Sequence, residues 1–364
     1  MAEIFTEDIL IEILSRLPAK SLMRFKCVGK RWRSLISNPG FAKLHLQRLK
    51  AGDLIPSQRI FKTSPLESID YELHDGVIGG DDDLAVVEVH ELRLGNPRWQ
   101  PPYLVGSCHG LVCLLVPGRF FLYNPTTRES RSFPCCDLVP QVPQNWLVYG
   151  FGYDPRSEDY KILQFGSANE RQEAIFSLKS GSWRRIQVQR ESQPTYFNQG
   201  VYWNGALHWC VVDMSRNECE TAIMSFDLSE EKFHQVLPVP EVDGQVLFMG
   251  LGIHGANLFI YRGTYDDCCE AWTMNEYGRG GSWTKWFSVS TKRIPGYTEW
   301  QTVPVVYTRS GKIVFLIDMD KMILFNPRDN TCKDYPIRRE IDVESATYLE
   351  TLISPYLSCE PLTI

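Results

Sequence analysis

A repeat with a period near 50 residues restricts most strongly what this 364-residue chain can fold into. Each unit contains a short β-type run that ends in an aromatic residue followed by a polar turn. These aromatic residues are spaced 53, 50, 46 and 53 apart: Tyr123, Phe176, Phe226, Trp272 and Phe325. A second aromatic residue begins the run after each turn: Phe133, Trp183, Phe233, Trp283 and Tyr335. A repeat of this length, built from short strands, is typical of the blades of a β-propeller.

A polar turn upstream of each aromatic residue joins two strands of the same unit. The turns that contain glycine are His109-Gly110, Asn204-Gly205, His254-Gly255 and Ser310-Gly311, and residues 156–159 take this place in the unit of Phe176. One period before Tyr123 lies Tyr71, so we expect a divergent first blade and six blades in total, with five or seven as alternatives. A strand within 346–352 is expected to pair with the first blade, because closing the ring removes its open edges.

The first fifty residues have a helical pattern instead. One apolar set falls at i, i+1, i+4, i+5 and i+8 before Pro18: Ile9, Leu10, Ile13, Leu14 and Leu17. A second set has spacings of three, three and four, with a break or bend expected at Gly29: Leu22, Phe25, Val28 and Trp32. Leu35, Ile36 and Phe41 continue the apolar surface. So small a unit buries too little surface to be stable alone, so it docks either on the rest of the chain or in a groove of another protein.

Charge separates the same two parts. Residues 1–50 have a formal net charge of +6, and the remainder has −12. The basic cluster Arg24, Lys26, Lys30, Arg31 and Arg33 is open to two interpretations: a nuclear-localisation or nucleic-acid patch, or a solvated helix face beside an acidic partner. The overall charge of −6 favours the second interpretation, because affinity for nucleic acid depends on neutralising phosphates. We therefore expect no nucleic-acid partner.

Other patterns concern the cellular compartment. No run of about 18 apolar residues is present, so no membrane insertion is expected. The N-terminus is acidic and then amphipathic, unlike a secretory signal. The chain has eleven cysteines but no Cys-x-x-Cys pair and no Asn-x-Ser/Thr site. These features predict reduced thiols and a cytoplasmic or nuclear location.

Three N-terminal segments together resemble an F-box of the plant type: 6–18, 20–28 and 30–39. Phe5-Thr6 departs from the family pattern, and so does Gly29, which costs about 1 kcal/mol if it lies within a helix. The resemblance implies docking on a Skp-class adaptor and, through it, on a cullin. The residues expected to form or support this adaptor-binding face are Ile9, Leu10, Ile13, Leu14, Leu17, Pro18, Leu22, Phe25, Val28, Trp32 and Ile36.

The repeat region resembles the F-box-associated interaction domain of plant F-box proteins, a domain related to kelch propellers. The segments that carry the resemblance are 106–112, 123–125, 150–154 with 159–161, and 348–355, although strict kelch double glycines do not occur at each period. The expected fold is a small all-α helical hairpin, the F-box, followed by an all-β propeller. The expected boundaries are F-box 1–48, linker 49–60, propeller 61–357 and C-terminal tail 358–364.

Catalytic and metal-binding alternatives concern a few particular residues. The segment 106–110, with Cys108 at its centre, is superficially similar to a nucleophile elbow, but a strand pattern comes next where that motif requires a helix. Cys108, His109 and Cys113, or His208 and Cys210, lack a fourth ligand and a recognised zinc spacing. We therefore expect no catalytic residue, no metal and no cofactor.

The resemblance implies a substrate-recognition subunit of an SCF-type (Skp-cullin-F-box) ubiquitin ligase, which positions a protein substrate and supplies no catalysis itself. Two alternatives remain open: a propeller enzyme of the oxidase or glycosidase kind, and a non-degradative F-box scaffold. Within the family the substrate is expected to be an immune or signalling protein, or a self-incompatibility ribonuclease. The charge of −12 mildly favours a basic substrate. The sequence does not indicate which residues bind the substrate, so these are unknown at this point.

Overall fold

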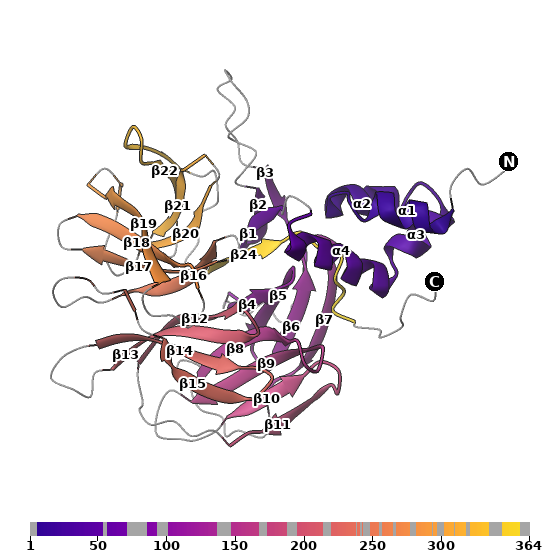
Figure 1. Ribbon diagram of the computed structural model, residues 1–364, viewed down its shortest axis with the longest axis horizontal. Coiled ribbons are helices and arrows are strands. Elements are labelled where there is room, and N and C mark those ends of the chain that lie inside the picture. Colours follow the sequence, from indigo (N-terminus) through magenta and orange to yellow (C-terminus); the bar gives the residue numbers. More distant parts are fainter. Residues whose placement is uncertain are drawn as a thin grey trace.

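The structure is a computed structural model of the chain. It describes residues 6–53, 57–70, 86–92, 101–136, 147–166, 173–187, 195–213, 220–237, 239–240, 242, 248–254, 257–264, 267–276, 282–292, 294–296, 302–308, 310–317, 321–334 and 344–356. A group of helices lies beside a ring of small sheets, with α4 against the sheets and α1 and α3 farther out (Figure 1). Helices and sheets therefore form the two parts that the sequence predicts.

The helical part contains four helices rather than the two of a simple hairpin. They are α1 (Glu7–Leu14), α2 (Ala19–Phe25), α3 (Lys30–Ile36) and α4 (Pro39–Ala51). Gly29 lies between α2 and α3 in extended backbone, so the expected break is confirmed and the glycine falls outside both helices. Asn38 caps α4 by accepting a hydrogen bond from the Gly40 amide at 2.7 Å, and Gly52 ends it in the left-handed conformation.

Six four-stranded antiparallel sheets form the blades, which confirms the number expected from the repeat. Blade 1 contains β24 (Ser345–Leu349), β1 (Gln58–Thr63), β2 (Leu66–Asp70) and β3 (Val86–Val89). Blade 2 contains β4 (Tyr103–Cys108), β5 (Leu111–Val116), β6 (Arg119–Asn124) and β7 (Glu129–Pro134). Blade 3 contains β8 (Leu147–Asp154), β9 (Asp159–Gly166), β10 (Ala174–Ser177) and β11 (Ser182–Arg185).

The remaining three blades come in chain order. Blade 4 contains β12 (Thr195–Trp203), β13 (Ala206–Asp213), β14 (Glu220–Asp227) and β15 (Lys232–Leu237). Blade 5 contains β16 (Gly250–His254), β17 (Asn257–Thr264), β18 (Cys268–Met274) and β19 (Trp283–Ser290). Blade 6 contains β20 (Thr302–Tyr307), β21 (Ile313–Ile317), β22 (Lys321–Asn326) and β23 (Thr331–Asp334). The innermost strands of neighbouring blades contact one another around the whole circle, so the ring is closed.

The C-terminal strand closes the ring, as expected. β24 pairs antiparallel with β1, and Ile60 lies opposite Thr347. β24 takes the innermost place in blade 1, the place that the first strand takes in every other blade. Blade 1 is therefore built from both ends of the propeller sequence, which explains why its repeat looks divergent. Tyr71, Gly255 and Tyr335, three positions of the expected repeat, lie outside the described residues.

The repeated aromatic residues lie on the third and fourth strands of the blades. Phe176 on β10 pairs with Trp183 on β11, and its ring stacks on Phe133 of blade 2 with centroids 4.4 Å apart. Trp183 and Trp283 are only partly buried, whereas Trp209 on β13 is fully buried. Trp183 and Trp283 therefore pack only partly into the core of their blades. Both residues lie on the outermost strand of a blade, and one side of such a strand faces solvent.

The helices and the ring share one apolar core. Leu14, Leu22 and Phe41 belong to the same buried cluster as residues of blades 2 and 3 and Leu352 after β24. Lys20 on α2 forms ion pairs with Glu88 on β3 and with Glu350, the second at 3.6 Å. Of the two docking alternatives for the helical unit, docking on the rest of the chain is therefore realised, and it involves one face of that unit.

Four buried histidines, His45, His90, His109 and His208, predict a loss of stability in mild acid. Burial lowers the pKa of His90 to about 4, of His109 to about 3 and of His208 to about 4. The unfolded chain titrates near 6.5, so below that pH it binds protons that the folded state does not, and stability falls as pH falls.

We expect urea unfolding at pH 7.5, 6.0 and 5.0 to give steadily lower free energies of unfolding. Below about pH 6, His208→Gln should reduce the slope by about one proton, or about 1.4 kcal/mol per pH unit. His234, which is exposed, supplies the control His234→Gln, whose free energy of unfolding at pH 7.5 should match that of the wild type. A wild-type stability that is flat over this range would contradict the prediction.

Candidate functional site

Two isoleucines of α1 form an exposed apolar surface. Ile9 and Ile13 are each 46% exposed and, four residues apart, lie on the same side of the helix. Leu10 and Leu14, from the same expected set, are buried in the core shared with the ring. One side of α1 therefore holds the helix to the rest of the molecule, and the other presents apolar surface to solvent.

The other expected adaptor-face residues divide in the same way. Pro18 and Val28 are exposed, and Val28 reaches 62%. Those that are partly buried are Leu17, Phe25 and Trp32, and those that are buried are Leu22 and Ile36. The Phe25 and Trp32 rings pack edge to face with centroids 5.5 Å apart, which links α2 to α3. Exposed members are thus placed for direct contact with a partner, and buried members support them.

Sequence reasoning did not predict α4 as a separate helix. Phe41, Ala42 and Leu46 bury its inner side, and His45 makes a hydrogen bond between Nε2 and the Leu17 carbonyl oxygen at 2.8 Å. Burial lowers the pKa of His45, which keeps the ring neutral. The missed signal was local: an Asn N-cap, Pro at the first helical position, and Gly after the last turn.

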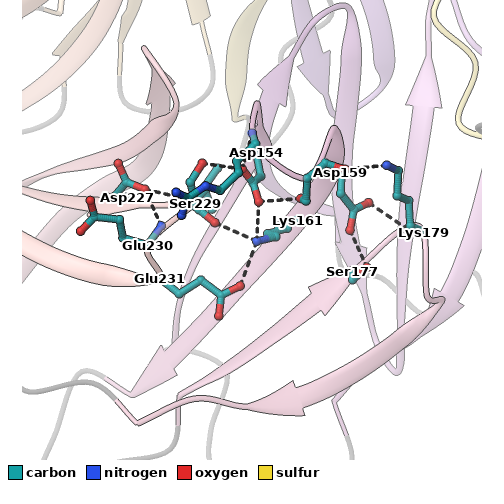
Figure 2. A network of polar contacts seen from close by, with 12 residues as sticks. Asp154, Asp159, Lys161, Ser177, Lys179, Asp227, Ser229, Glu230 and Glu231 are labelled. Atoms are coloured by element: carbon teal, nitrogen blue, oxygen red, sulfur yellow. Dashed lines mark hydrogen bonds and ion pairs between the residues drawn. The ribbon is translucent and has the colours of Figure 1, made fainter.

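A polar network joins blades 3 and 4 at the motif 150–154 with 159–161 (Figure 2). Lys161 Nζ lies 2.8 Å from Asp154 Oδ2 and 2.8 Å from Glu231 Oε1, and it donates to the Leu228 carbonyl oxygen at 2.8 Å. The Ser229 hydroxyl donates to Asp154 from the turn of blade 4. One lysine of blade 3 thereby holds the β14–β15 turn of the next blade.

The charged groups of this network stabilise one another. Burial alone would raise the pKa of Asp154, but hydrogen bonds from Lys161 and two serine hydroxyls outweigh it and hold the pKa well below its usual range. Asp159 accepts from the Lys179 amide at 2.9 Å and from the Ser177 hydroxyl. Because these groups bind one another, the network holds blades 3 and 4 in position relative to each other.

The three other segments that carry the family resemblance, 106–112, 123–125 and 348–355, contact one another beside the closing strand β24. Asn124, fully buried on β6, donates through Nδ2 to the carbonyl oxygens of Thr351 and Ile353 at 3.1 and 2.7 Å. The Thr351 hydroxyl donates to the His109 carbonyl oxygen at 2.8 Å. Gly110 has φ +86°, and a Cβ there would lie 2.7 Å from the Leu349 carbonyl oxygen. These segments therefore hold the C-terminal strand and the residues after it in place.

The geometry around Cys108 gives the elbow interpretation no support. His109 and Gly110 form a tight turn with positive φ, and the strand β5 begins at Leu111. Burial raises the pKa of the Cys108 thiol and lowers that of His109, so both groups are neutral. Among the described residues, no cluster of three or more His, Cys, Asp or Glu is arranged to hold a metal ion. No helix in that part of the chain is long and apolar enough to span a membrane.

The fold and these surfaces define a protein that joins a small helical docking unit to a six-bladed propeller. Comparison with protein families matches residues 4–44 to the F-box domain and residues 77–353 to the F-box associated beta propeller domain. The chain therefore belongs to the F-box proteins with an F-box-associated propeller, and the predicted resemblance is confirmed.

Relatives in Arabidopsis thaliana agree with this assignment. F-box/kelch-repeat protein At3g23880 is 32% identical, over 96% of this chain and 95% of that protein. F-box protein CPR1 is 29% identical, over 88% of this chain and 81% of that protein. Among solved structures, the β-propeller domain of Myceliophteria thermophila Cps50 (Swd1) aligns with a TM-score of 0.40 and 10% identity, covering 67% of this chain and 76% of that one. The assignment depends on the family matches and the curated relatives alone.

Proposed function

We propose that this protein is the substrate-recognition subunit of an SCF-type ubiquitin ligase. The F-box docks on a Skp-class adaptor, which links it to a cullin, and the propeller holds a protein substrate for ubiquitination. The observation that carries the proposal is the exposed pair Ile9 and Ile13 on an F-box whose other side is buried against the ring.

The proposed role is positional. Ubiquitin transfer needs a substrate lysine held near a loaded conjugating enzyme, and holding reactants together raises their effective concentration. The protein contributes two binding surfaces and no nucleophile. The F-box and the ring share a core, so a docked F-box holds the propeller in a defined orientation relative to the ligase. We propose a cytoplasmic or nuclear location, where the nine described cysteines, all free, would stay reduced.

The test is co-purification of the full chain with a Skp-class adaptor. We expect Ile9→Asp combined with Ile13→Asp to weaken adaptor binding on the order of 100-fold, because two carboxylates would be buried where apolar contact is needed. Both side chains are 46% exposed, so the variant should keep the stability of the wild type. Leu14→Asp would be a poor test, because Leu14 is fully buried and its loss would unfold the helices.

Val89→Asp is the matched control for this variant. Val89 on β3 is 60% exposed, so the substitution makes the same apolar-to-acidic change at a propeller residue outside the expected adaptor-binding set. The control should bind the adaptor as tightly as the wild type. A wild-type chain that binds no Skp-class adaptor would overturn the proposed function. Equal binding by the wild type and the double variant would place the adaptor on another surface.

A further inference from the structure

The segment from α2 to α3 carries a concentration of positive charge without acidic neighbours in sequence. Residues 19–37 contain six lysines and arginines and no aspartate or glutamate. Two of the six face the propeller: Lys20 pairs with Glu88 and Glu350, and Lys26 is half-buried, where burial lowers its pKa and Glu129 partly offsets this. The remaining four are exposed: Arg24, Lys30, Arg31 and Arg33.

Three of these cations lack an internal partner. Within the described ranges, no carboxylate lies within 4.0 Å of the charged groups of Arg24, Lys30 or Arg33. Some cations elsewhere in the chain are paired: Lys43 lies 3.0 Å from Glu158, and Arg262 lies 2.6 Å from Glu270. The contrast matters because the chain as a whole has six more acidic than basic side chains and could have supplied partners.

An exposed apolar residue lies in the same segment. Val28 is 62% exposed, the most exposed of the large apolar side chains described, and it falls in the turn between α2 and α3. Lys30 and Arg33 lie three residues apart on α3, where like charges repel and slightly destabilise a helix. An apolar centre with a charged rim is the usual composition of a protein–protein interface, and complementary charge there mainly raises the association rate.

We propose that Arg24, Lys30 and Arg33 form, around Val28, a basic patch that meets an acidic surface of the adaptor and accelerates its docking. The inference rests on the proposed function. It adds that the adaptor surface facing the patch is acidic and that this charge controls the association step. The α1 isoleucines then provide most of the affinity, whereas the basic patch provides attraction over the distance at which the proteins first meet.

The test is the association rate constant between the full chain and a purified Skp-class adaptor, measured by stopped-flow fluorescence. The patch variant combines Arg24→Glu, Lys30→Glu and Arg33→Glu. At about 50 mM salt we expect its association rate to fall at least about tenfold, and at about 300 mM salt we expect most of the difference to vanish because ions screen the charges. Its dissociation rate should change by less than about threefold.

The control variant makes the same change in net charge on the propeller: Arg119→Glu, Arg156→Glu and Lys292→Glu. All three side chains are exposed. The control should lose no more than about twofold in association rate, because its charges lie away from the patch. Equal effects in the two variants would show that only net charge matters and would overturn the proposal.

Two further outcomes separate the proposal from its alternatives. A wild-type chain that binds the adaptor, with a patch variant as fast as the wild type, would overturn the patch and leave the proposed function intact. A wild-type chain that binds no adaptor would overturn both. A third outcome concerns nucleic acid. If the wild type bound an RNA or DNA duplex and the patch variant did not, while the adaptor association rates of the two were equal, the partner of the patch would be a nucleic acid and the proposal would be wrong.

Discussion

Gly110→Ala is expected to destabilise the protein by about 3–4 kcal/mol, although it adds a single methyl group. About 1–2 kcal/mol comes from the left-handed backbone at φ +86°, which residues other than glycine adopt at a cost. The rest comes from crowding, because the new Cβ would lie 2.7 Å from the Leu349 carbonyl oxygen and 2.9 Å from Thr351 Cγ2. The atoms in the way belong to the closing strand and the segment after it, so the substitution opposes closure of the ring.

Gly118→Ala separates the two causes. Gly118 has φ +81°, almost the same backbone conformation, but no atom lies within 4 Å of the position its Cβ would take. The control should lose only about 1–2 kcal/mol. Urea unfolding of both variants gives the difference, and limited proteolysis should cut the C-terminal segment of Gly110→Ala sooner. Equal losses in the two variants would mean that the C-terminal segment does not press on this turn.

Trp209→Ala is expected to lower the free energy of unfolding by about 3–5 kcal/mol. Trp209 is the largest fully buried side chain described, and its Nε1 donates to the Tyr149 carbonyl oxygen of blade 3 at 3.3 Å. A Cβ on Gly200 would lie 2.7 Å from the Trp209 ring, so the backbone already packs closely against that ring. We therefore expect the cavity left by Trp209→Ala to close only partly. Thermal or urea unfolding measures the loss.

Trp183→Ala is the matched control. Trp183 lies on the outer strand of blade 3, is only partly buried and also donates to a carbonyl oxygen in the preceding blade, that of Pro134 at 3.0 Å. The same deletion there should cost roughly 1–2 kcal/mol, because solvent already reaches the ring. If Trp209→Ala lowered the free energy of unfolding no more than Trp183→Ala does, burial of Trp209 would not be a main source of stability for blades 3 and 4.

Repeating local patterns were enough to predict the architecture. The spacing of Tyr123, Phe176 and Phe226 recurs because each blade is made of consecutive strands whose pairing depends on nearby residues. The closing strand was also predictable, because an open ring would leave unpaired edges on blade 1. By contrast, α4 was not predicted, although Asn38 and Gly52 mark its ends, because its apolar residues continue the pattern of the preceding helices without a clear break.

The candidate site was predictable only as a set of residues. Ile9, Leu10, Ile13 and Leu14 look alike in a helical apolar pattern, and the pattern does not say which side of the helix the ring will cover. Only the packing of the F-box on blades 2 and 3 buries Leu14 and leaves Ile13 in solvent. In the same way, the sequence shows a basic segment, but only the fold pairs Lys20 with Glu350 and leaves Lys30 without a partner among the described residues.

By itself the sequence predicted a small helical unit followed by a propeller, with six blades expected and five or seven as alternatives, because helical spacing and a period near 50 residues are local properties of the chain. The resemblance of the two parts to known families then implied an F-box and its associated propeller. The tertiary structure decided how the two parts meet, which apolar and basic residues face outward, and how Asn124 and Gly110 hold the residues around the closing strand in place. Those features depend on contacts between residues far apart in the chain, and such contacts have no local pattern from which they can be predicted.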